Sequence, residues 1–167
     1  MISIVDMRER PHHLGRVARI VHREWWSQTT TPPEVIRNWL KGHLGAEGFP
    51  ATFLAMYGEE LAGFVALHLT EAEDRPAYQP YLGALFVQPE HRSRGIGAAL
   101  VRSVEARARD LGHAAIYLNA GDACVGLYEG LGWEVIERGY GARRQLSIMR
   151  RALGRSPPQL PTVRPRP

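Results

Sequence analysis

The segment that decides the fold reads Val87-Gln88-Pro89-Glu90-His91-Arg92-Ser93-Arg94-Gly95-Ile96-Gly97-Ala98. An apolar run precedes it and an amphipathic run follows, so we expect a strand, a polar turn and then a helix that begins at the two glycines. The first turn of a helix has backbone amides without intrahelical partners, and the helix dipole adds partial positive charge there. Glycine permits close approach to this backbone, and the two arginines add formal charge. The turn is therefore a candidate site for a pyrophosphate or a similar anion.

Two common phosphate-binding patterns do not fit this turn. The dinucleotide fingerprint needs a third glycine, and Leu100 stands at that position. The P-loop needs a Gly-Lys-Ser/Thr sequence, whereas Lys41 is the only lysine of the chain. On local sequence alone, a glycine-started helix with solvated arginines and no ligand remains the alternative.

Strand and helix patterns alternate along the rest of the chain. Strands are expected at residues 2–7, 51–57, 61–70, 81–87, 114–118, 133–137 and 145–149. Helices are expected at residues 11–26, 95–111 and 122–130, and from a Thr31 cap to Leu44. This order predicts one mixed α/β domain over residues 1–152, followed by a Pro- and Arg-rich tail over residues 153–167.

Composition and charge exclude several classes of protein. The chain has 167 residues, of which 44% are hydrophobic and 23% charged, as in globular domains. Four arginines of the final 17 residues account for the whole net charge of +4, so no nucleic-acid-binding face is expected on the body; binding through the basic tail is the alternative. No apolar run has the length of a membrane helix, no signal peptide is evident, and one cysteine excludes an internal disulfide. We therefore expect a cytoplasmic protein without membrane contact.

Two motifs resemble those of one enzyme family. Arg92-Ser93-Arg94-Gly95-Ile96-Gly97 is similar to Arg/Gln-x-x-Gly-x-Gly/Ala, the acetyl-CoA motif of the GNAT (Gcn5-related N-acetyltransferase) family. Leu127-Tyr128-Glu129-Gly130-Leu131-Gly132-Trp133 is similar to the family's second motif, and the element order matches over residues 2–150. The resemblance implies a single-domain GNAT-like α/β fold, with a mixed, mostly antiparallel sheet and helices on both faces. It also implies an N-acetyltransferase that uses acetyl-CoA as co-substrate, often as a homodimer.

The resemblance also assigns residues to the coenzyme. Backbone groups of Phe86 and Val87 would pair with the pantetheine arm, as an added strand does. Tyr128 would contact the coenzyme and act as the general acid that protonates its departing thiolate. Asn119 would reach the coenzyme from a strand end, although Gly121 stands where many relatives have asparagine. The pyrophosphate would be held by the amides of Arg92, Ser93, Arg94, Gly95, Ile96, Gly97 and Ala98.

The general base and the acceptor site are less clearly indicated. Many relatives carry a glutamate on the strand before the motif, but residues 81–87 contain no acid. Acids of the preceding loop are substitutes, with His68 behind them, and Glu71 is the candidate base. An acidic loop favours a cationic amine, either a small molecule or a protein amino group. The residues expected to face this acceptor are Glu24, Trp25, Glu73, Asp74 and Tyr81.

Other functions remain open on the sequence. A non-catalytic acyl-CoA-binding sensor or interaction module would use the same turn, with Tyr128 serving only to pack the helix. Cys124 is expected to be structural, because nothing nearby would lower the pKa of its thiol. The seven histidines are scattered without a His-Glu-x-x-His pattern, so no metal site is expected.

Overall fold

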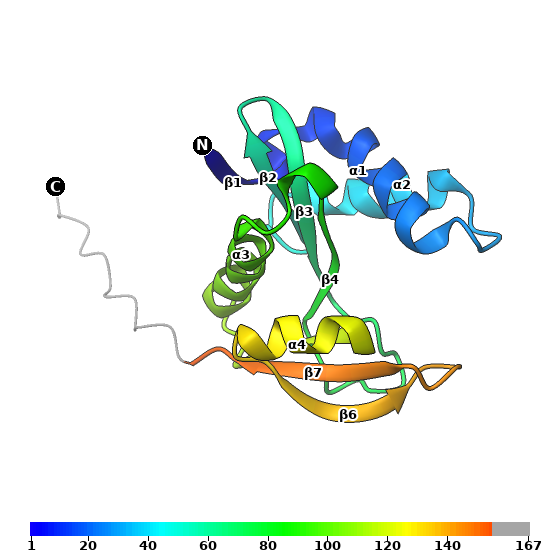
Figure 1. Ribbon diagram of the computed structural model, residues 1–167. Coiled ribbons are helices and arrows are strands. Elements are labelled where there is room, and N and C mark those ends of the chain that lie inside the picture. Colours follow the sequence, from blue (N-terminus) through cyan, green and yellow to red (C-terminus); the bar gives the residue numbers. More distant parts are fainter. Residues whose placement is uncertain (155–167) are drawn as a thin grey trace, which may run out of the picture.

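The computed structural model describes residues 1–154 (Figure 1). Its strands are β1 (Ile2–Asp6), β2 (Ala51–Tyr57), β3 (Glu60–His68), β4 (Tyr81–Val87), β5 (Ala115–Gly121), β6 (Glu134–Tyr140) and β7 (Leu146–Ala152). Its helices are α1 (Leu14–Val21), α2 (Pro33–Lys41), α3 (Ile96–Asp110) and α4 (Asp122–Gly130). A π-helical turn, η3 (His22–Trp26), extends α1, and the short 3₁₀ helix η5 (Pro89–His91) follows β4. The expected mixed α/β fold class is confirmed.

All seven strands form one sheet in the order β1-β2-β3-β4-β5-β7-β6. Every neighbouring pair is antiparallel except β4 and β5, which are parallel. These two strands pair only at Tyr81 and Tyr117. The sheet is therefore continuous at one end of β4 and open between β4 and β5 at the other.

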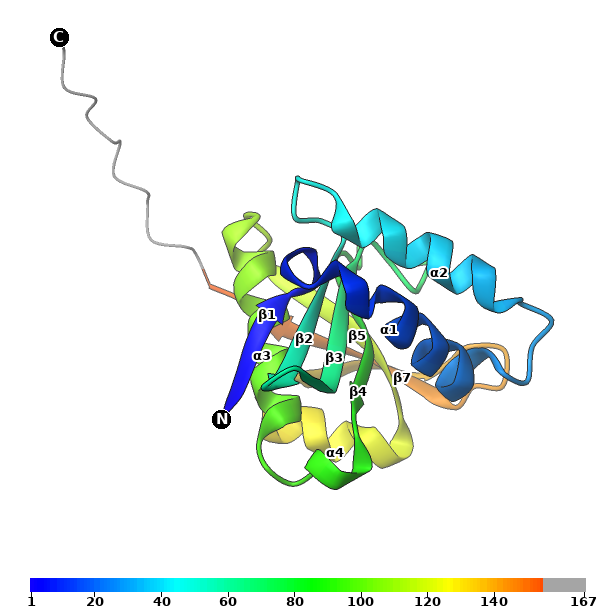
Figure 2. The ribbon, with the colours of Figure 1, turned by 90° about the horizontal axis from the view of Figure 1, so that it is seen from above.

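Helices cover both faces of the sheet (Figure 2). On one face, α1 and α2 bury Val17, Val21 and Leu40 against apolar side chains of β2 and β3. On the other face, α3 buries Leu100 and Val104, and residues of α4 join the same core. The two apolar layers hold the strands that carry the candidate site in fixed positions.

Of two expectations about the first helices, the helical range 11–26 is confirmed with a more varied geometry, and the Thr31 cap is wrong. The predicted helix over residues 11–26 consists of a 3₁₀ turn, then α1, then the π-helical turn η3. The N-cap of α2 is Pro32, not Thr31, and no side chain caps that helix. Thr31 belongs to the preceding turn, because its amide bonds to Thr29 Oγ1 (3.2 Å) and its carbonyl lies 3.0 Å from His22 Nε2.

The packed domain includes the first residue of the predicted tail. Leu153 is 4% exposed and belongs to the core that contains α3, and Arg109 Nε donates to its carbonyl (2.7 Å). Residues 155–167 of that tail lie outside the described residues. Within residues 1–154, no helix combines the length and the apolar character needed to cross a membrane.

Candidate active site

The open side of β4 is the first part of the site. One edge of this strand pairs with β3, including Phe64 with Phe86 and Gly63 with Val87. Its other edge has no strand partner beyond Tyr81 within residues 1–154. A bulge at Ala84, whose φ is +49°, shifts the register in the middle of the strand. Backbone groups of β4 on this side are therefore left for a ligand rather than for β5.

The turn after β4 presents the amides of residues 93–98, which have no hydrogen-bond partner among the described residues, whereas the amide of Arg92, also predicted to hold the pyrophosphate, already donates to the Pro89 carbonyl (3.3 Å). Gly95 is the N-cap of α3 with φ +77°, a conformation that suits glycine, and no side chain caps the helix. A Cβ at Gly95 would meet nothing within 4 Å, so the space above the first turn is open. Arg92 and Arg94 are exposed beside it, and Arg92 Nε donates to the Val87 carbonyl (2.9 Å). Free amides, open space and two cations together fit a pyrophosphate.

An acid from the loop lies against β4. His68 Nε2 is 3.0 Å from Glu71 Oε1, and the ring of Trp39 meets His68 edge to face at 5.4 Å. A Cβ at Gly83 would collide with the Glu71 carboxylate and would lie 2.8 Å from His68 Nε2. The absent side chain of Gly83 therefore makes room for a carboxylate on a strand that has none of its own.

Tyr128 and Asn119 lie near this carboxylate. Tyr128 is 8% exposed and packs edge-on against Trp133, with 5.9 Å between ring centroids. Burial raises the pKa of its hydroxyl, and the charges of Cys124 and Glu71 raise it further, so it stays protonated at neutral pH. Asn119 Nδ2 donates weakly to the Glu71 carbonyl (3.4 Å), while its buried Oδ1 has no partner among the described residues. A proton donor, an acid and a free acceptor atom thus surround the same part of the sheet.

The sequence profile of the Acetyltransferase (GNAT) family matches residues 14–133. The chain belongs to this family. Its GNAT fold agrees with two solved structures: YncA of Salmonella typhimurium with its cofactor acetyl-CoA, and an aminoglycoside 6′-N-acetyltransferase complexed with coenzyme A. YncA is 16% identical, with a TM-score of 0.70 over 94% of this chain and 96% of that one. The aminoglycoside enzyme is 17% identical, with a TM-score of 0.70 over 94% and 99% of the two chains.

A curated relative is N-acetyltransferase family 8 member 2 of Rattus norvegicus. It is 33% identical over 97 residues, which are 56% of this chain. The match spans 42% of the length of that relative. The GNAT family and fold expected from the two motifs are therefore confirmed, whereas the acceptor is not identified by these similarities.

Two residues predicted to face the acceptor, Glu73 and Asp74, belong to the loop of residues 71–80. Tyr140 donates a hydrogen bond to Asp74 Oδ1 (2.7 Å), which holds the pKa of that carboxyl below its usual value. Arg75 pairs with both oxygens of Glu137 (3.1 and 2.5 Å) and with Asp74 (2.8 Å). Glu73 is exposed. The contacts of Asp74 and Arg75 tie the loop to β6, and these two residues line an open pocket of about 550 Å³ that reaches the β6–β7 turn.

The remaining predicted acceptor residues lie in different surroundings. Trp25 is 46% exposed on η3, where Glu24 accepts a hydrogen bond from Arg23 Nε (2.9 Å). Tyr81 is fully buried, and its ring stacks with that of Tyr117 at 6.2 Å between centroids. Tyr81 therefore offers no exposed surface for the predicted contact with an acceptor.

Sequence reasoning missed the role of Gly83 and the contact of Trp39 with His68. A glycine inside a buried strand is a signal that another group approaches the backbone closely, so Gly83 could have been noticed. Trp39 sits on α2 at helical spacing from Ile36, a pattern that suggests ordinary packing. Nothing in the sequence separates it from a core residue.

Proposed function

We propose that this protein is an N-acetyltransferase that transfers an acetyl group from acetyl-CoA directly to an amine. The observation that carries the proposal is the unpaired edge of β4, which leads into the uncapped first turn of α3. This arrangement offers main-chain groups to a narrow chain that ends in a pyrophosphate. Family membership and the coenzyme complexes of YncA and of the aminoglycoside enzyme support the same co-substrate.

The coenzyme would be held mostly by the backbone. Carbonyl and amide groups of Phe86 and Val87 would pair with the pantetheine arm, and the acetyl carbonyl would lie near the Val87 amide. The turn from Arg92 to Ala98 would hold the pyrophosphate. Asn119 Oδ1 has a free lone pair to accept from a coenzyme amide.

Proton transfer would be divided between two residues. Acetyl-CoA supplies a thioester whose C–S bond breaks as the amine nitrogen forms the new C–N bond. Glu71 takes the proton that a lysine-like ammonium, with a pKa near ~10.4, must lose before it can attack. Tyr128 gives a proton to the departing thiolate. The nitrogen loses a further proton as the amide forms, and this proton balances the one that Tyr128 gives up. His68 is a positioning residue, because it holds the carboxylate of Glu71 by a hydrogen bond of 3.0 Å.

A cationic acceptor fits the surroundings of Glu71 better than an anionic one. Glu73 and Asp74 add negative charge, and Arg75 is already paired with Glu137 and Asp74. The exposed indole of Trp25 offers an apolar surface to the acceptor's hydrocarbon part. Replacing Glu73 and Asp74 with their amides should raise the KM for a polyamine or an aminoglycoside; an unchanged KM would remove the argument for a cation.

Calorimetry with acetyl-CoA tests the coenzyme site. Wild-type protein should bind with micromolar affinity, and Gly97→Trp should abolish binding because the indole would fill the turn. Gly42→Trp is the matched control, since a side chain at Gly42 meets nothing within 4 Å and lies far from α3 in the sequence. Folded wild-type protein that does not bind acetyl-CoA would overturn the proposal.

Thiol release then separates an enzyme from a sensor. With a panel of polyamines, aminoglycosides and peptides, an acetyltransferase liberates coenzyme A faster when the right amine is present. A non-catalytic acyl-CoA sensor binds the coenzyme equally well but shows no amine-dependent release. The carboxylate beside Gly83 favours the enzyme, because it supplies the acid that β4 lacks.

A further inference from the structure

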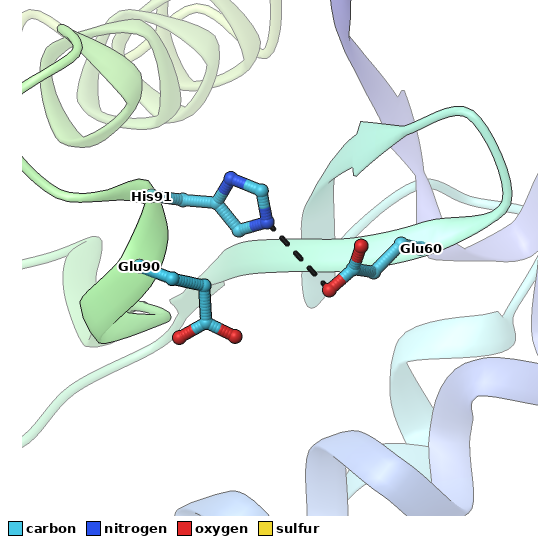
Figure 3. A group of neighbouring side chains, drawn as sticks. All are labelled: Glu60, Glu90 and His91. Carbon is cyan, nitrogen blue, oxygen red and sulfur yellow. Dashed lines mark ion pairs between the residues drawn. The ribbon is translucent and has the colours of Figure 1, made fainter.

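A cluster of one histidine and two glutamates lies away from the carboxylate of Glu71. Glu60 is the first residue of β3, while Glu90 and His91 belong to η5 (Figure 3). The Gln88 amide donates to the Ala62 carbonyl (2.8 Å), which holds η5 beside β3. The ligand atoms of the three side chains all lie within 4.8 Å of one another. The fold thus gathers two distant segments around one point.

His91 is the residue that sets this cluster apart from ordinary surface acids. It is 7% exposed, and neither ring nitrogen has a hydrogen-bond partner among residues 1–154. Figure 3 shows Nε2 directed at the Glu60 carboxylate, at 3.6 Å from Oε1. That separation is too long for a hydrogen bond. A buried, unpartnered nitrogen aimed at carboxylates calls for an explanation, and a metal ion bound between them would supply one.

We propose that Glu60, Glu90 and His91 bind a divalent transition-metal ion, with Zn²⁺ as the best fit. One imidazole and two carboxylates form a donor set that zinc accepts, whereas Mg²⁺ and Ca²⁺ prefer oxygen ligands alone. Zinc ligands at ~2.0–2.2 Å in a tetrahedron lie about 3.3–3.6 Å apart. The separation of His91 Nε2 from Glu60 Oε1 already matches this value. Glu90 is exposed, so its side chain can rotate inward by the remaining ångström or so.

The proposed ion would be structural rather than catalytic. His91 immediately precedes Arg92, where the chain enters the turn before α3. An ion shared with Glu60 would fasten η5 to the start of β3, with a water in the fourth position. No short sequence motif predicts this site, because Glu60 is far in sequence from the adjacent Glu90 and His91.

Calorimetry with ZnCl₂ tests the proposal on the full, tag-free chain after treatment with a chelator. At pH 7.5, one Zn²⁺ should bind per chain, and Glu60→Gln and Glu90→Gln should each weaken it by at least about tenfold. Glu59→Gln is the matched control, because this exposed neighbour in the same turn is outside the cluster. Co²⁺ in place of Zn²⁺ should give a visible absorption band that Glu60→Gln abolishes. The test uses variants of the two exposed glutamates, because a variant of the buried His91 can lose metal binding simply by misfolding.

Two results would overturn the site. If Zn²⁺ binds equally well to wild-type, Glu60→Gln and Glu90→Gln protein, the ion lies elsewhere, for example at the neighbouring rings of His12 and His13, whose centroids are 4.3 Å apart. If no ion binds at pH 7.5, the three side chains do not form a metal site. Neither result depends on acetyl transfer, so this test fails or succeeds independently of the proposed enzyme activity.

Discussion

The carboxylate of Glu71 depends on the absence of a side chain at Gly83, and Gly83→Ala tests this dependence. The new methyl would lie 2.8 Å from His68 Nε2, where about 3.4 Å is ordinary contact, and it would overlap the Glu71 carboxylate. The carboxylate must therefore withdraw by on the order of 1 Å. A displacement of that size in a reacting group costs about 10²-fold in rate, or about 2.7 kcal/mol of transition-state stabilisation.

Thiol release under saturating acetyl-CoA is the assay for Gly83→Ala. We expect kcat to fall by about 10²-fold, while calorimetry shows unchanged coenzyme affinity and circular dichroism shows a folded protein. Gly126→Ala is the control, because a Cβ there meets nothing within 4 Å on α4. The reasoning is refuted if Gly83→Ala turns over like the wild type while Glu71→Gln is inactive. An active Glu71→Gln would instead remove Glu71 as the base.

Three further predictions concern other residues. Tyr128→Phe should lower kcat by about 10²-fold with unchanged acetyl-CoA affinity, and the raised pKa of Tyr128 means that wild-type kcat does not fall up to about pH 10. Burial lowers the pKa of His43 to about 4. Between about pH 6.5 and 4 this histidine is therefore protonated in the unfolded chain but not in the folded protein, so the folded protein loses stability as the pH falls. Urea unfolding should show a loss of about 3 kcal/mol between pH 6.5 and 4 that is absent in His43→Gln; equal pH slopes would contradict it. Arg75→Met should raise the acceptor KM in steady-state assays without changing coenzyme affinity, because it frees the loop from Glu137; an unchanged acceptor KM would show that this link does not shape the acceptor site.

The sequence predicts the elements of the proposed coenzyme half well because that half is local. The strand, the turn and the helix that contain Val87 and Gly97 are contiguous, and a helix N-terminus has the same open amides wherever it occurs. Helix and strand periodicity likewise predicts most elements of the sheet. The Thr31 cap fails because a hydrogen bond to His22 holds that residue in the preceding turn, a contact across nine positions that no pattern encodes.

The acceptor half could not be predicted in the same way, since it depends on segments that meet only in the folded protein. Glu71 was a candidate base, but its position against Gly83 requires a loop to fold over a strand. Tyr81 illustrates the converse. As an aromatic residue it is expected to face an amphipathic amine, but its ring is fully buried and stacks with that of Tyr117.

The opening between β4 and β5 has a consequence for what can enter the protein. Exposed strand edges normally attract strands of other molecules and promote aggregation. This edge is internal, with β3 on one side and the second half of the sheet on the other, and the opening closes at Tyr81 and Tyr117. A full peptide strand would need the regular spacing of about 4.8 Å to both neighbours along its length, which a wedge does not offer. We therefore expect the gap to suit slender, flexible chains better than polypeptide strands, so that the unpaired backbone of β4 does not become a site of self-association.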